Sequence, residues 1–163
     1  QLAKHLGCTV IATASAGNHA YVRGLGADQV IDYNAQDFSA IGPVCDVVFD
    51  TVGGDTFCRS IACTRVYGRI VSLLQWNCDA EQMKLARTRN LALSFELILT
   101  PTVLGLHEER VHQRRILEEG ARLIEADKLK IKISHILPLA DAAKAHAMIE
   151  EGHTTGKIVL KEV

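Results

Sequence analysis

The first half of the chain alternates short apolar runs with segments of helical period, and this alternation limits the possible folds more than any other feature. The apolar runs are rich in β-branched residues and predict buried strands at 8–14, 29–31, 45–49, 69–74 and 91–99. Strands that are apolar on both faces are typical of parallel sheets covered by helices on both sides. Right-handed crossovers then give a doubly wound α/β fold.

The second half of the chain has a different pattern. A long amphipathic helix is predicted at 108–127, followed by a strand at 130–136, a helix at 140–151 and a final strand at 156–161. This change of pattern near residue 107 predicts a division of the chain into two structural regions, before and after that residue.

Charge and hydropathy exclude several classes of protein. Lys plus Arg total 18 and Asp plus Glu total 19, so the net charge of -1 gives no electrostatic reason to bind nucleic acid or an anionic membrane. The longest apolar stretch, at 91–106, is interrupted by Ser94, Glu96, Thr100 and Pro101, which argues against a membrane span. No basic segment leads into an apolar run at the start, so we expect no signal peptide and a cytoplasmic location.

The cysteines suggest a reducing compartment. They are odd in number and form no C-x-x-C pair: Cys8, Cys45, Cys58, Cys63 and Cys78. This pattern favours small apolar core residues over a disulfide framework or a closed zinc site.

Ligands of doubly wound sheets bind at the carboxyl ends of the strands, and the sequence marks three such ends. They are the segments 13–18, 50–54 and 73–75, where small residues and glycines allow a flat ligand to approach the backbone. The dinucleotide fingerprint G-x-G-x-x-G is absent. In a βαβ unit that fingerprint is followed by a helix, a glycine and a strand. This chain opens with a helical segment, then Gly7, then the strand predicted at 8–14. We therefore expect the first strand and the glycine-rich loop upstream of Gln1.

The end of the first predicted strand favours NADP over NAD. NAD-specific sites place an acid there for the ribose 2′-hydroxyl, whereas this chain has Thr13, Ala14 and Ser15. Hydroxyl groups and the Asn18 amide can donate hydrogen bonds to a 2′-phosphate, and Arg23 is the nearby cation.

Several ordered motifs match one known family. They are LGADQVIDY at 25–33, DVVFDTVGG at 46–54, GRIV at 68–71 and GKIVL at 156–160. With them the chain resembles the medium-chain dehydrogenase/reductase superfamily, in its quinone oxidoreductase and zinc-type alcohol dehydrogenase-like branch.

This resemblance implies a domain division. Residues 1–107 would form a Rossmann-type dinucleotide-binding domain without its first strand and glycine-rich loop. Residues 108–163 would be the return segment of a GroES-like catalytic domain. The zinc ligands and most substrate contacts of such enzymes belong to the N-terminal domain, so zinc is possible in the full-length protein. No residue of this chain is assigned as acid, base or metal ligand. Members commonly dimerise through the strand at 91–99, which predicts a homodimer through that edge.

The resemblance also implies contacts to the adenosine end of the cofactor. Ser15 and Tyr33 match positions at the 2′-phosphate end in NADPH-dependent members. Asn18 stands where such members often carry Lys. Packing of Tyr33 at a strand end is an alternative.

The remaining implied contacts run from the ribose to the nicotinamide. Thr51, Val52 and Gly53 match the turn beside the adenosine ribose, and Leu73 and Leu74 match the wall against the nicotinamide. The strand at 95–97, with Leu97, matches the one whose backbone holds the carboxamide, and Lys157 matches a position near the pyrophosphate. Plain core positions for the two leucines and a solvated charge for the lysine stay open.

The resulting functional hypothesis is the cofactor-binding half of an NADP(H)-dependent oxidoreductase. It would transfer hydride between the nicotinamide and a small molecule, namely a quinone, an enone or aldehyde, or an alcohol. The chain by itself is expected to be inactive. A non-catalytic dinucleotide-binding or scaffold protein of the same fold is the alternative, and an unrelated α/β module complete at 163 residues is a third.

Overall fold

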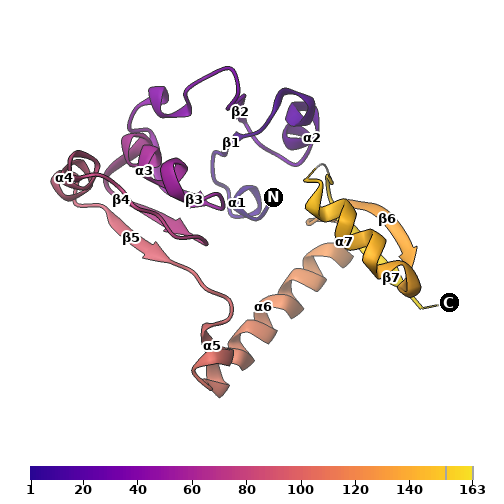
Figure 1. The fold of residues 1–163 in the computed structure, drawn as a ribbon. Coiled ribbons are helices and arrows are strands. Elements are labelled where there is room, and N and C mark those ends of the chain that lie inside the picture. Colours follow the sequence, from indigo (N-terminus) through magenta and orange to yellow (C-terminus); the bar gives the residue numbers. More distant parts are fainter. Residues whose placement is uncertain (153, 163) are drawn as a thin grey trace. The chain divides into compact units, whose positions relative to one another are not determined.

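The computed structural model describes residues 1–152 and 154–162, in which strands and helices alternate along the chain (Figure 1). The chain divides into two compact units. One is Thr9–Gln113, and the other combines Gln1–Cys8 with the described part of Arg114–Val163.

The unit Thr9–Gln113 is built on parallel strands. Its strands are β1 (Ile11–Thr13), β2 (Gln29–Ile31), β3 (Cys45–Asp50), β4 (Thr64–Ser72) and β5 (Ala92–Phe95). β1 pairs with β2 in one sheet, and a second sheet has the order β3-β4-β5. Every one of these pairs is parallel. The α/β class predicted from the apolar runs is therefore confirmed.

One edge of each sheet is open where the predicted upstream strand would lie. Among the described residues, β1 pairs only with β2, and β3 pairs only with β4. In a doubly wound sheet the first strand lies between the second and the fourth. The predicted upstream strand would pair between β1 and β3, and it stays a prediction.

Helices connect these strands. They are η1 (Ala16–Asn18), α2 (His19–Gly24), η2 (Phe38–Ile41), α3 (Gly54–Cys63), α4 (Ala80–Thr88) and α5 (Thr100–Val103). The main core lies between α3, β4 and α4, and its fully buried members include Phe57, Ile61 and Ile70. A second cluster of Ile31, Phe38 and Cys63 joins the two-stranded sheet to α3. Apolar residues of α3 thus hold both sheets in one unit.

β4 contains a local irregularity that the sequence indicated only in part. Cys45 pairs with Thr64 but Val47 pairs with Arg69, so residues 65–68 bulge out of the strand pairing. A Cβ atom at Gly68 would lie 2.5 Å from the Thr64 side chain, which leaves room for glycine alone. The strand predicted at 69–74 therefore lies in β4, which begins earlier, at Thr64, and ends at Ser72.

The strand predicted at Leu91–Leu99 is too long. β5 ends at Phe95, and the Thr100 N–H donates a hydrogen bond to the Leu97 carbonyl in a turn. Pro101 stands in the first turn of α5 and has no N–H to offer a strand partner. Leu97 therefore lies beyond the strand rather than in it.

The expectation that all cysteines are reduced is wrong for one pair. Cys58 of α3 and Cys78 form a disulfide with a Cα–Cα distance of 5.3 Å. The chain returns from β4 across the face of α3, and only this path brings together two cysteines that are 20 residues apart. Cys8, Cys45 and Cys63 are free thiols. Burial raises the pKa of the Cys63 thiol to about 11 and also raises that of Cys45, so both stay protonated at neutral pH.

The other unit contains α1 (Leu2–His5), β6 (Ile133–Pro138), η3 (Leu139–Asp141), α7 (Ala142–Glu150) and β7 (Lys157–Lys161). β6 and β7 are parallel. The Gln1 side-chain amide donates a hydrogen bond to the Lys130 carbonyl (3.0 Å) and accepts one from the Lys130 backbone N–H (2.7 Å). The long helix α6 (His107–Glu125) begins where the sequence pattern changes, near residue 107. The boundary between the two compact units lies inside this helix, after Gln113. The predicted domains 1–107 and 108–163 stay a prediction. In the part of the chain that the structure describes, no helix is both long and apolar enough to cross a membrane.

Arg89 closes the C-terminal end of α3, and its removal is expected to destabilise the unit. Its guanidinium donates to the carbonyl oxygens of Ile61 and Ala62 in the last turn of α3 and of Thr64 just after it, each at 3.0 Å, and its positive charge lies at the negative end of the helix dipole. We expect Arg89→Ala to lower the free energy of unfolding by about 2 kcal/mol. Urea denaturation measures this, with the exposed neighbour Arg87→Ala as control, expected to change it by less than about 0.5 kcal/mol. Equal effects of the two variants would contradict this role.

Candidate functional site

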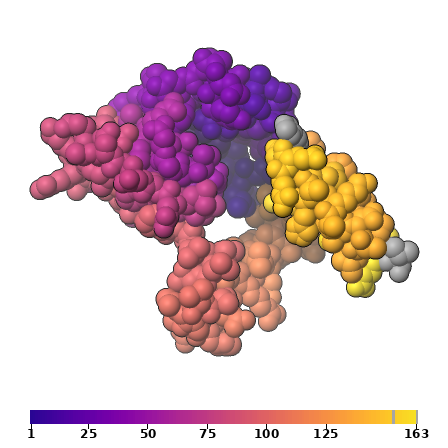
Figure 2. Space-filling model, viewed as in Figure 1, coloured from indigo at the N-terminus to yellow at the C-terminus, as the bar shows by residue number. Residues whose placement is uncertain are grey.

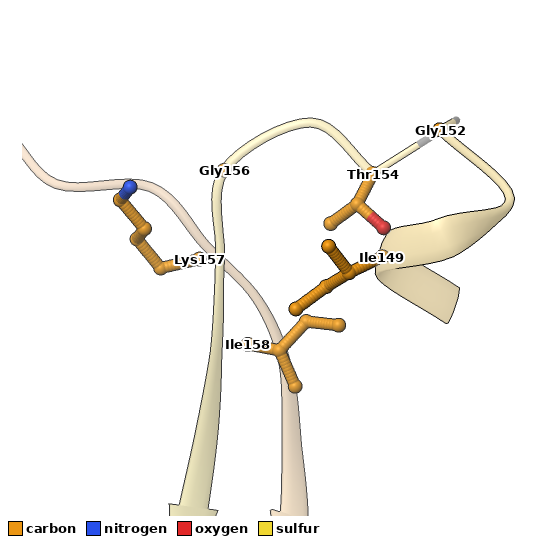
Figure 3. Close-up of a pocket in the computed structure, with 6 residues that line it drawn as sticks. All are labelled: Ile149, Gly152, Thr154, Gly156, Lys157 and Ile158. Carbon is orange, nitrogen blue, oxygen red and sulfur yellow. The ribbon is translucent and has the colours of Figure 1, made fainter. Parts of the chain in front are cut away.

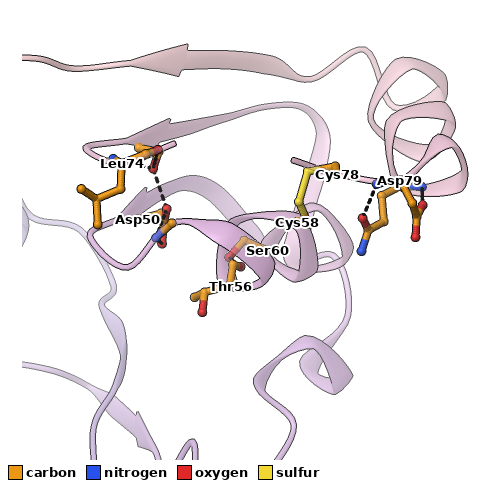
Figure 4. Close-up of a disulfide and its surroundings, with 10 residues drawn as sticks. Asp50, Thr56, Cys58, Ser60, Leu74, Cys78 and Asp79 are labelled. Atoms are coloured by element: carbon orange, nitrogen blue, oxygen red, sulfur yellow. Dashed lines mark hydrogen bonds between the residues drawn. A yellow bond between two sulfur atoms is a disulfide. The ribbon is translucent and has the colours of Figure 1, made fainter. Parts of the chain in front are cut away.

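A buried carboxylate organises the carboxyl end of β3. Asp50 is only 4% exposed. Its oxygens accept hydrogen bonds from the backbone N–H groups of Val52 (3.1 Å) and Gly53 (3.0 Å) and from the Ser72 hydroxyl (2.6 Å). A buried charge is tolerated when it is satisfied in this way. The Asp50 carboxylate therefore folds the turn after β3 and ties it to the end of β4 (Figure 4).

Backbone contacts continue this connection between the two loops. The Leu73 N–H donates to the Asp50 carbonyl (3.1 Å), and the Gly54 N–H donates to the Gln75 carbonyl (2.9 Å). Gly53 has φ +74°, and a Cβ atom there would lie 2.7 Å from the Leu74 Cβ. The turn after β3 and the loop after β4 thus approach each other more closely than any residue but glycine permits.

These contacts bring most of the predicted site residues to one place. We call it the carboxyl edge, and it consists of Thr51, Val52, Gly53, Leu73, Leu74 and Leu97. The Glu96 N–H donates to the Ser72 carbonyl (2.9 Å), which joins the end of β5 and the following Leu97 to the other two strands. Leu73 is 41% exposed and Leu74 is 50% exposed. Both leucines are thus exposed in this chain, and their contact with the nicotinamide stays a prediction beside the alternative of core positions.

The predicted adenosine residues lie at the ends of β1 and β2. The side-chain amide of Asn18 donates a hydrogen bond to the Ser15 hydroxyl (3.1 Å), and the backbone N–H of Asn18 donates to the Ser15 carbonyl (2.9 Å). Tyr33 lies just after β2 and is exposed in this chain. Since β1 and β2 are paired and parallel, Ser15, Asn18 and Tyr33 lie at one edge of their sheet. Their contacts to a cofactor stay predictions.

Lys157 belongs to the other unit. It begins β7 next to a hollow of about 310 Å³ lined by Ile149, Gly152, Thr154, Gly156, Lys157 and Ile158. Figure 3 shows its amino group on the side of the strand away from Ile149 and Ile158. The predicted contact of Lys157 with a pyrophosphate stays a prediction.

Asp50 and Ser72 are the site residues that sequence reasoning missed. Asp50 opens the predicted strand-end segment 50–54, whereas Ser72 lies inside the strand predicted at 69–74. An Asp followed by two residues and a Gly carries a usable signal, because its carboxylate can accept from the backbone of a turn. Nothing in the sequence indicates that Ser72 is the partner of Asp50.

The side chains of the described residues fit a dinucleotide better than a metal ion. Across residues 1–152 and 154–162, no group of three His, Cys, Asp or Glu side chains could hold a metal ion, so these residues do not fit zinc. For a dinucleotide, the carboxyl edge offers an exposed apolar wall beside a glycine turn. The Ser15 hydroxyl and the Asn18 amide offer hydrogen-bond donors for a phosphate.

Comparisons with known proteins agree with this geometry. A family model described as zinc-binding dehydrogenase matches residues 25–160. The chain is 31% identical to a quinone oxidoreductase of Pseudomonas aeruginosa, over 98% of this chain and 51% of that protein. It is 30% identical to a 2-haloacrylate reductase of a Burkholderia species, over 97% of this chain and 49% of that protein. The chain thus spans about half the length of the curated relatives it matches.

Solved structures give the same result. A quinone oxidoreductase structure from Coxiella burnetii matches with a TM-score of 0.73 and 36% identity, over 99% of this chain and 47% of that one. A structure of a 2-haloacrylate reductase matches with a TM-score of 0.78 and 26% identity, over 99% of this chain and 52% of that one.

Replacement of Asp50 tests the buried carboxylate. In Asp50→Asn an amide N–H replaces one acceptor oxygen among the donors of Val52, Gly53 and Ser72. We expect the free energy of unfolding to fall by about 2–3 kcal/mol, because a buried donor loses its partner. Urea denaturation measures the loss. Asp46→Asn is the control, since Asp46 is exposed and its ion pair with Arg65 is worth less than about 1 kcal/mol. A loss no larger than the control's would show that Asp50 does not organise the edge.

The two neighbouring glycines give a second, matched test. Gly53 and Gly54 both have positive φ, but nothing lies within 4 Å of a Cβ atom at Gly54. Gly54→Ala should therefore cost only the backbone strain, about 1 kcal/mol. Gly53→Ala adds a clash with Leu74 and should cost about 3 kcal/mol in total. Unfolding curves of the two variants compare them, and equal costs would mean that the close approach of the loops does not constrain residue 53.

Proposed function

The chain belongs to the zinc-binding dehydrogenase family, and from this premise we propose that it is the cofactor-binding half of an NADP(H)-dependent oxidoreductase. The full-length protein would transfer hydride between a nicotinamide and a quinone, an enone or aldehyde, or an alcohol. The carboxyl edge is the observation that carries the proposal. It combines a glycine turn and exposed apolar residues at the ends of neighbouring parallel strands.

The names of the relatives favour an electron-poor substrate. A quinone and a 2-haloacrylate both contain a carbon–carbon double bond conjugated to a carbonyl group, and both accept hydride in a reduction. We therefore place quinones and α,β-unsaturated carbonyl compounds first among the substrate classes.

The residues of this chain would bind and orient rather than react. The nicotinamide, when bound, supplies or accepts the hydride. The turn that contains Gly53, packed against Leu74, would lie beside the ribose, while Leu73 and Leu74 would press against one face of the ring and exclude water from it. The fixed geometry of the edge, set by Asp50 and Ser72, would hold this wall in place.

A direct test measures turnover by the complete protein. We expect NADPH oxidation when a quinone or an enone is added, monitored as the loss of absorbance at 340 nm. Tight NADPH binding without turnover on quinones, enals or alcohols would favour the alternative, a non-catalytic dinucleotide-binding or scaffold protein. No NADPH binding at all would contradict both.

The preference for NADP is proposed to depend on the Ser15–Asn18 pair. Asn18→Asp places a carboxylate where the 2′-phosphate would lie, so we expect NADPH affinity to fall about tenfold through charge repulsion while NADH affinity changes little. Fluorescence titration with each cofactor measures both. Asn90→Asp, at an exposed site between α4 and β5, is the control and should leave both affinities unchanged. An equal loss for the two cofactors would place the 2′-phosphate elsewhere.

A homodimer through the β5 edge is proposed as well. Within the described residues β5 pairs only with β4, and the segment after it lies on the surface of its unit (Figure 2). That segment exposes large apolar side chains: Leu97, Ile98, Leu99, Val103 and Leu104. A second copy would pair with the open edge and cover these residues. Sedimentation of the complete protein should give twice the mass of one chain.

We propose a cytoplasmic location, which the free thiols of Cys8, Cys45 and Cys63 favour, whereas the Cys58–Cys78 disulfide counts against it because such a compartment reduces disulfides. Unpaired thiols persist in a reducing compartment. Cell fractionation tests this.

A further inference from the structure

We propose that Cys58 and Cys78 form a redox-sensitive clamp that sets the affinity of the carboxyl edge for the dinucleotide. The disulfide holds the β4–α4 loop, residues 73–79, in the position that binds the cofactor, and its reduction to two thiols releases the loop. The inference rests on the proposed function, because the ligand it regulates is the dinucleotide.

The β4–α4 loop is fixed at both ends. At its beginning, the Leu73 N–H donates to the Asp50 carbonyl and the Gln75 carbonyl accepts from Gly54. At its other end, Cys78 is bonded to Cys58 of α3, and the next residue, Asp79, caps α4 (Figure 4). The residues that would touch the nicotinamide and the disulfide are therefore parts of one short segment.

Trp76, in the middle of this loop, is held by packing against the core and by ring stacking. Trp76 stacks between Phe57, at 4.4 Å between ring centroids, and Phe95, at 5.4 Å. Its buried indole N–H has no hydrogen-bond partner among the described residues. Stacking permits sliding, whereas a hydrogen bond would fix the position of the ring. The restraints on either side of Trp76 are therefore the hydrogen bond from the Gly54 N–H to the Gln75 carbonyl and the disulfide at Cys78, and only the disulfide can be opened by reduction.

The disulfide also joins the two sides of the cofactor site. α3 begins at Gly54, directly after the turn that contains Gly53, and Cys58 lies one helical turn further on. Leu74 packs against Gly53. When the bond between Cys58 and Cys78 opens, the loop that carries Leu74 loses its covalent link to the helix that begins after the Gly53 turn.

Reduction takes place by exchange with a dithiol. A thiolate of the dithiol attacks the Cys78 sulfur, because Cys58 is only 3% exposed and Cys78 is more accessible. The Cys58 sulfur leaves and takes a proton, and a mixed disulfide remains on Cys78. The second thiol of the reductant then displaces the Cys78 sulfur, which takes the second proton. Two electrons pass to the cysteine pair, and the dithiol becomes a disulfide. Glutathione disulfide, a disulfide oxidant, drives the reverse reaction.

The surroundings of Cys58 connect this exchange to cofactor binding. The departing Cys58 sulfur would lie in the apolar core beside Phe57, Ile61 and Ile70, which disfavours a thiolate. The loop must move before the exchange proceeds, and a ligand that holds the loop opposes this movement. By linkage, the factor by which the disulfide strengthens NADPH binding equals the factor by which NADPH stabilises the disulfide.

The test compares two redox states of the complete protein. One sample is kept oxidised with glutathione disulfide and the other is reduced with dithiothreitol, and alkylation with mass spectrometry verifies the state of Cys58 and Cys78. Hydrogen exchange of residues 73–79 reports on the loop without any ligand, and NADPH titration reports on the affinity. We expect faster exchange in the loop and about tenfold weaker NADPH binding after reduction.

Two variants provide the controls. Cys78→Ser should bind NADPH like the reduced protein and should not respond to dithiothreitol. Cys8→Ser removes an exposed free thiol and should respond like the wild type. Should Cys78→Ser fail to fold, the comparison of the two redox states of the wild type still decides the question.

The outcomes separate the clamp from the proposed function. Unchanged exchange in residues 73–79, unchanged NADPH affinity after verified reduction, or a pair that glutathione disulfide never oxidises would each overturn the clamp. Absence of NADPH binding in both states would overturn the proposed function and the regulatory claim that rests on it. Faster loop exchange on reduction would in that case still support the clamp as a structural device.

Discussion

The Asp50 carboxylate is the interaction on which the rest of the candidate site depends. A parallel sheet aligns the ends of its strands but leaves the loops beyond them free to take many conformations. Here one buried charge accepts from two backbone N–H groups of its own turn and from the hydroxyl group of the next strand. The loops after β3 and β4 are thereby fixed relative to each other, and the apolar residues they carry form one edge.

The fixed turn also positions the main core. α3 starts directly after the Gly53 turn and places Phe57 and Ile61 against Ile70 of β4. The same helix brings Cys58 to Cys78 and gives Trp76 a ring to stack on. Polar contacts at the strand ends and apolar packing beneath them thus meet at one helix, and the β4–α4 loop joins the carboxyl edge to the Cys58–Cys78 disulfide.

Particular residues show how far prediction from sequence extends. The runs at 29–31 and 45–49 are strands because β-branched residues favour the pleated, partly buried surface of a sheet. The strand predicted at 91–99 ends early because Pro101 initiates a helical turn, a local signal that the apolar composition outweighed. The sequence marks Gly53 as a point of close approach to a ligand, but its nearest neighbour in the structure is the Leu74 side chain.

The sequence by itself determined the class of fold and the order of its elements, because periodicity and turn chemistry are local properties of the chain. Tertiary structure alone decided which strand ends are neighbours, that Ser72 is the partner of Asp50 and that Cys58 meets Cys78. These pairings join residues about twenty positions apart, and the path of β4 back along α3 sets them. No local pattern encodes such a distance, since it results from the packing of a whole helix on a sheet.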